Sequence, residues 1–132
     1  MIKEVCKFIE NKTSLILGTT LFVNQYTQNA PDRCTIAMNT TGGDVNYYKP
    51  KYSKTVFSFI TRSDSWNTAN DDADTIRDLF KSNCDYDLPI VDAGLEYHVA
   101  SSHPVGETVY IGEDEKNRHQ FSVNIMFDII EK

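Results

Sequence analysis

Residues 55–82 read TVFSFITRSDSWNTANDDADTIRDLFKS, and this stretch decides the fold. Its first eight residues are rich in β-branched and aromatic side chains, which favour a strand. Phe57 and Phe59 point to one side of such a strand, while Val56 and Ile60 point to the other. Because both faces are apolar, we expect these eight residues to form an interior strand of a sheet.

A helix is predicted directly after this strand. Ser63, Asp64 and Ser65 all have the short oxygen-bearing side chain that caps a helix, so any of the three can be the capping residue. Apolar side chains then recur at three- and four-residue steps, at Trp66, Ala69, Ala73, Ile76 and Phe80. The two segments together predict a long helix packed on a sheet.

The rest of the chain predicts a short amphipathic helix, further strands and several loops. The expected helix covers residues 2–11, and the expected strands cover residues 21–23, 34–39, 95–100, 109–111 and 120–129. Loops are expected over residues 24–33, 45–54 and 83–93. These elements predict an α+β fold, in which one long and one short helix pack on a mainly antiparallel sheet. At this length, residues 1–132 are expected to form a single domain.

The net charge, the cysteines and the hydropathy of the chain exclude some classes of protein. The net charge is −6 and the isoelectric point is about 4.9, which argues against a protein that grips nucleic acid by its phosphates. An acidic surface is still compatible with a channel through which DNA passes without being bound. The three cysteines are far apart, as in proteins of a reducing cytoplasm. No apolar run approaches membrane-spanning length, so no membrane partner is expected.

No catalytic or metal-binding motif stands out in the sequence. Asp71, Asp72 and Asp74 could bind a hard cation, but the glycine and the distal glutamate of a calcium loop are missing. A solvated helix face is our interpretation of this acidic cluster. Ser102 and His103 are adjacent in the chain, and adjacent loop residues rarely give the geometry of a nucleophile and its base. We therefore expect no enzymatic activity, no metal and no cofactor.

One segment combines aromatic and basic side chains and is a candidate binding surface. Its members are Tyr47, Tyr48, Lys49, Lys51, Tyr52 and Lys54. This composition suits a single-stranded nucleic acid as well as the rim of a protein interface, and the acidic net charge favours the protein interface. Arg62, at the end of the predicted central strand, is expected to pair with Asp64 or with a neighbouring subunit.

Several short blocks of sequence follow one another in a characteristic order and spacing. They are Leu17-Gly18, Leu21-Phe22-Val23, Ala30-Pro31-Asp32, Gly42-Gly43, RSDSWNTANDDADTI at residues 62–76, and YIGEDEKNRHQFSVN at residues 110–124. Over most of the chain, these blocks resemble a family of small bacteriophage proteins, the tail terminators and minor capsid proteins of long-tailed phages.

The resemblance implies a structural virion protein at the head-tail junction, assembled in the host cytoplasm. Such a protein forms a ring of six copies that caps the completed tail tube, stops its polymerisation and joins it to the head connector. Its expected partners are therefore its own copies, the tail tube protein and the head connector, while DNA passes through the channel. Alternatives are a head-completion or connector protein of similar size and a small nucleic-acid-binding module. The family has no catalytic residues to carry over.

The turn before the last strand is the expected docking element. It carries three acids and one base, Glu113, Asp114, Glu115 and Lys116, between two strand-like segments. Together with Arg62 and the three tyrosines Tyr47, Tyr48 and Tyr52, these residues are the predicted interface with other copies or with partner proteins.

Overall fold

The computed structural model describes residues 1–25, 30–39, 44–45, 52–81 and 83–132. Tyr47, Tyr48 and the Gly42-Gly43 turn lie outside these described residues. Two helices are described, α1 (Ile2–Lys12) and α2 (Trp66–Phe80). The strands are β1 (Leu21–Val23), β2 (Cys34–Asn39), β3 (Asp44–Val45), β4 (Tyr52–Ser63), β5 (Asn83–Asp87), β6 (Tyr97–Pro104), β7 (Val109–Glu113) and β8 (His119–Glu131).

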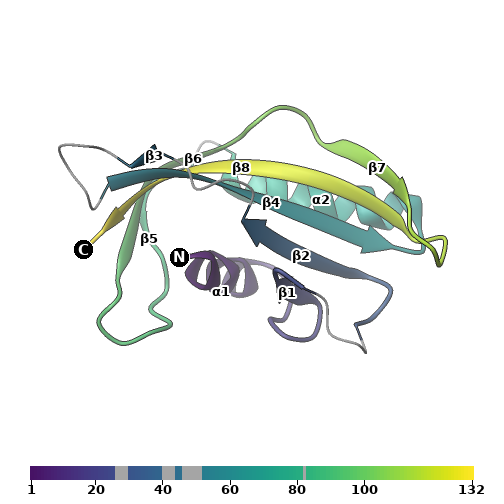
Figure 1. Ribbon diagram of the computed structural model, residues 1–132, viewed down its shortest axis with the longest axis horizontal. Helices are drawn as coiled ribbons and strands as arrows, with labels where there is room; N and C mark the ends of the chain where they lie inside the picture. The colour runs from purple at the N-terminus through teal and green to yellow at the C-terminus, as the bar shows by residue number, and fades with distance from the viewer. Residues whose placement is uncertain (26–29, 40–43, 46–51, 82) are drawn as a thin grey trace.

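All of these strands belong to one eight-stranded sheet (Figure 1). Its order is β1-β2-β4-β8-β6-β5, with β3 beside β4 and β7 beside β8. At its centre, β4 and β8 pair antiparallel without a break, from Tyr52 opposite Ile130 to Ser63 opposite His119. β4 also pairs with β2 on its other side, so the predicted interior position of this strand is confirmed.

Both helices pack on one face of the sheet and form the larger core with it. The core includes Phe57 and Phe59 of β4 and alternate residues of β8, from Phe121 to Ile129. Phe80, at the end of α2, is fully buried, and its ring centroid lies 5.0 Å from that of Phe127. The alternation of β8 and the helical spacing of α2 therefore bury matching apolar surfaces against each other.

The opposite face of the sheet carries a smaller apolar cluster. Phe22, Cys34 and Ile36, from β1 and β2, are buried there, with Ile60 of β4 partly buried beside them. The expectation that β4 has apolar side chains on both faces is therefore confirmed. The start of α2 also agrees with the sequence, since the Thr68 N–H donates to the hydroxyl oxygen of the N-cap Ser65. Neither of the described helices is long and apolar enough to cross a membrane.

The expected fold class is wrong. The part of the chain that the structure describes is mostly β, with 46% strand and 23% helix, and both helices are short, at 11 and 15 residues. The sheet is mixed, because β1 and β2 run parallel, with Leu21 opposite Thr35. The prediction of a mainly antiparallel sheet packed by one long helix underestimated the strands, since β8 alone has 13 residues.

Two expected loops also contain strands. Residues 45–54 include the start of β4, and residues 83–93 include β5. β5 has the polar sequence NCDYD, which lacks the apolar alternation of a strand, and it forms because its backbone pairs with β6. The strand predicted over residues 95–100 begins later, at Tyr97, and continues to Pro104.

Replacing Phe80 by alanine should lower the free energy of unfolding by about 3–5 kcal/mol, because the change leaves a cavity among several aromatic rings. Urea denaturation of the purified protein measures this loss. The matched control is Ile90→Ala, at an exposed position, which should change the stability by less than about 0.5 kcal/mol. Equal effects of the two substitutions would contradict the described core.

Candidate partner-binding site

The turn between β7 and β8 has a defined backbone shape. We call residues 113–118 the hairpin tip. Tyr110 lies opposite Phe121 and Gly112 lies opposite Gln120, so Ile111 is an extra residue, a β-bulge. Gly112, with φ 107°, and Asn117, with φ 60°, have the positive φ values that glycine and asparagine adopt most easily.

Asp114 organises the hairpin tip. Its carboxylate accepts hydrogen bonds from the backbone N–H groups of Lys116, at 3.0 Å, and Arg118, at 2.9 Å. The Arg118 guanidinium donates to the other carboxylate oxygen over 2.7 Å. The backbone N–H of Asp114 also donates to the Arg118 carbonyl over 3.0 Å. A single carboxylate therefore closes the turn through both backbone and side-chain groups.

The environment of Asp114 favours its charged form. Burial acts to raise the pKa of this carboxyl, but the hydrogen bonds from the backbone and guanidinium of Arg118 and from the Lys116 backbone outweigh it. The resulting pKa lies below its ordinary value, and the pKa of Arg118 is raised. The pair is therefore ionised at neutral pH.

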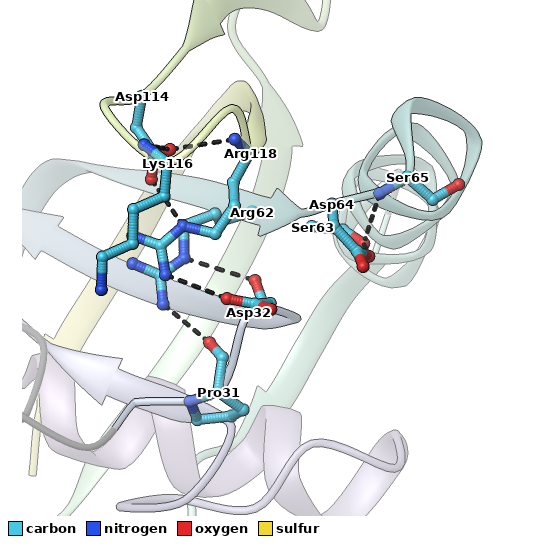
Figure 2. A network of polar contacts seen from close by, with 9 residues as sticks. All are labelled: Pro31, Asp32, Arg62, Ser63, Asp64, Ser65, Asp114, Lys116 and Arg118. Carbon is cyan, nitrogen blue, oxygen red and sulfur yellow. Dashed lines mark hydrogen bonds and ion pairs between the residues drawn. The ribbon is translucent and has the colours of Figure 1, made fainter.

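Arg118 also ties the hairpin tip to the chain before β2 (Figure 2). One of its nitrogens lies 3.3 Å from the Asp32 carboxylate. Arg62, at the end of β4, donates to the backbone carbonyls of Pro31, at 2.7 Å, and Asp32, at 3.3 Å. Two arginines thus hold the hairpin tip, the end of β4 and residues 31–32 together.

Arg62 is placed inside this network rather than on an open surface, since it is only 5% exposed. Its expected neighbour Asp64 lies at the start of α2, where its carboxylate accepts a hydrogen bond from the Ser63 hydroxyl (Figure 2). Burial raises the pKa of the nearby Cys34 thiol, while the charges of Arg62 and Arg118 act in the opposite direction. Within a single copy, Arg62 therefore stabilises the fold.

The other predicted interface residues fall into two places. Glu113, Glu115 and Lys116 are exposed on the hairpin tip, close to Asp114. Glu113 lies 3.8 Å from His119 across the hairpin. Tyr52 is the first residue of β4 and lies opposite Ile130. Arg62 lies near the other end of the same strand. The described candidates therefore do not form one cluster.

Sequence reasoning missed Arg118 and Asp32 as parts of this site. The four-residue spacing from Asp114 to Arg118 was a visible signal, because it allows a local ion pair across a turn. The contact of Arg118 with Asp32 joins residues 86 positions apart, and no local sequence pattern predicts it.

The described residues contain no cluster of three or more histidine, cysteine, aspartate or glutamate side chains arranged to hold a metal ion. In the acidic stretch of α2, Asp72 forms a bidentate ion pair with Arg33. Two nitrogens of the Arg33 guanidinium donate to the two carboxylate oxygens of Asp72 over 2.8 and 3.0 Å. This carboxylate is therefore used in a contact between α2 and the start of β2.

Comparison with known proteins gives a match over nearly the whole chain. A family model described as bacteriophage tail terminator protein matches residues 8–130. One solved structure superposes with a TM-score of 0.53 at 15% identity, over 96% of this chain and 88% of that chain, which shows a shared fold. No curated protein sequence matches.

Replacing Asp114 by asparagine should open the hairpin tip. Hydrogen bonds to a charged group contribute roughly 1.5–3 kcal/mol, so we expect amide hydrogen exchange at Lys116 and Arg118 to accelerate by about tenfold or more. Exchange measured by NMR tests this expectation. Glu115→Gln, which removes an exposed acid from the same turn, is the matched control and should leave the exchange rates unchanged.

The same turn should respond to pH in the unsubstituted protein. Because the folded pKa of Asp114 lies below the ordinary value of 3.8, its stabilisation is complete above that value. It is lost as the pH falls through the lower folded pKa. The Lys116 and Arg118 amides, which donate to Asp114, should therefore keep their protection from hydrogen exchange from pH 7 to about 5 and lose it only in stronger acid. Loss of this protection centred near pH 6 would contradict this assignment.

Proposed function

This chain belongs to the bacteriophage tail terminator family, and we propose that it forms a ring that caps the tail tube and joins it to the head connector. Membership makes it a structural component of the phage virion at the tail, in a family of structural proteins rather than enzymes. The capping and joining steps are our proposal, and the hairpin tip is the observation that carries it.

The hairpin tip has the properties of a docking element. Its backbone is fixed before any partner binds, because Asp114 and Arg118 close the turn and Arg118 reaches Asp32. A turn that is already ordered loses little conformational entropy on binding. Glu115 and Lys116 are exposed and available for a partner, and Glu113 is exposed as well, although its carboxylate lies 3.8 Å from His119.

The proposed partners are other copies of this chain, the tail tube protein and the head connector. Six copies are expected from the resemblance to the family. The net charge of −6 per copy supports a channel through which DNA passes without specific binding, because a negative wall repels phosphates. Assembly of the ring is proposed to take place in the host cytoplasm, before the tail joins the head.

Light scattering behind a sizing column, with and without purified tail tubes, tests this proposal. We expect the mass of a closed ring for the protein alone or bound to tube ends, and we expect capped tubes to stop growing. Electron microscopy of the mixtures locates the ring. A protein that stays monomeric and never joins tubes would contradict the proposal, and a ring that binds only connector complexes would assign it to head completion instead.

A further inference from the structure

Strand β7 exposes apolar side chains next to the hairpin tip. Val109, Tyr110 and Ile111 are 54%, 43% and 51% exposed, and Val105 is exposed just before them. We call these four residues the β7 patch. β7 pairs with β8 along one edge, and along its other edge it pairs with no strand of the described chain. An exposed apolar strand with an open edge is a surface on which a partner strand or loop can dock.

The rim of the β7 patch is mainly acidic. Glu107 precedes the strand, Glu113 ends it, and Glu115 follows in the hairpin tip, and all three are exposed. Two cations lie near these acids: Lys116 is exposed on the tip, and the Arg77 guanidinium of α2 donates to the Gly106 carbonyl over 2.8 Å. A partner surface for this patch should therefore be apolar at its centre and carry positive charge.

An apolar groove with a positive charge at its edge lies between α1 and the end of α2. Its volume is about 350 Å³, and it is lined by Phe8, Lys12, Leu79, Cys84 and Tyr86. The rings of Phe8 and Tyr86 stack with centroids 5.0 Å apart. Among the described lining residues only Lys12 is charged, and its ammonium lies 5.9 Å from the centre of the Phe8 ring. The groove is thus apolar, with a cation at its edge.

The patch and the groove lie at opposite ends of α2. Trp66, the first residue of α2, packs edge-on against Phe121, and Tyr110 of the patch packs against the same ring. Phe80, the last residue of α2, contacts Phe8 of the groove. Fifteen helical residues span about 22 Å. Figure 1 also shows β7 near one end of the long axis and β5, which carries Cys84, near the other.

We propose that the β7 patch of one copy docks in the groove between α1 and α2 of the next copy. This inference rests on the proposed ring, and it names the two surfaces that would meet in it. The contact is heterologous, because it joins different surfaces of two identical chains, and such contacts close into rings when the rotation fits. Apolar side chains meet apolar side chains, and Glu113 and Glu115 approach Lys12.

Pairing of β7 with β7 of a second copy is less favourable. In an antiparallel pair centred on Tyr110, Glu107 of one copy would face Glu113 of the other, because both lie three residues from the centre. Like charges placed opposite each other on paired strands are destabilising. The charges at the two ends of the patch therefore favour the groove over self-pairing.

A disulfide cross-link tests the contact directly. Cys84 is exposed in the groove, whereas Cys6 and Cys34 are buried, and burial raises the pKa of Cys6 to about 12. The variant Ile111→Cys, oxidised with diamide alone and on tail tubes, should give a ladder of covalent oligomers. The ladder should disappear when Cys84 is replaced by serine. Ile16→Cys, at a site 55% exposed and away from the patch, is the control and should give no ladder.

Charge exchange gives a second, independent test. Glu113→Lys or Lys12→Glu alone should weaken self-association by about threefold or more, because each places like charges across the contact. The double variant should recover association close to that of the unsubstituted protein. Light scattering against protein concentration measures the effect, and the unfolding curve of each variant checks that it folds.

The results of these experiments distinguish a failure of this contact from a failure of the proposed ring. If the unsubstituted protein forms rings but Ile111→Cys gives no ladder and the double variant does not recover, the contact is wrong and the ring proposal stands. A cross-link to the tube protein, or a cross-linked dimer that persists without Cys84, also overturns the contact. If the unsubstituted protein never assembles, even on tubes, both proposals fail.

Discussion

The antiparallel pairing of β4 with β8 is the constraint on which the rest of the structure depends. Twelve residues of each strand are in register, from Tyr52 opposite Ile130 to Ser63 opposite His119. Because side chains alternate along a strand, this register sends Phe57, Phe59 and the apolar residues of β8 to the same face. A shift by one residue would turn the apolar set of β8 away from both helices. The same register brings Arg62 to the base of the hairpin tip.

The sequence predicts the elements whose pattern is local and strong. β4, α2 and β8 were expected from their own alternation or helical spacing, and α2 begins within the expected capping residues. β5 could not be predicted in this way, because its side chains are polar and β6 alone makes it a strand. The parallel pairing of β1 with β2 could not be predicted from local sequence either, since the direction of pairing depends on the path of the chain that connects the two strands.

The candidate site shows the same division between local and distant contacts. The acids of the hairpin tip are visible in the sequence, whereas its attachment to Asp32 depends on the whole sheet. The sequence suggested that Arg62 pairs with Asp64 or with a neighbouring subunit, but its guanidinium donates to backbone carbonyls that only the fold brings near. Such carbonyl acceptors stabilise a buried arginine, because an unsatisfied guanidinium would be costly to remove from water.

The net charge of −6 per copy sets the conditions under which a ring of such chains could form. Equal charges repel as copies approach, and physiological salt screens this repulsion beyond about 8 Å. The attraction must therefore come from short-range contacts in which few charges are buried. The β7 patch and the groove fit this requirement, since their central residues are apolar and their acids lie at the rim. In the proposed ring, acidic surfaces away from the contact would then face the proposed DNA channel without binding phosphates.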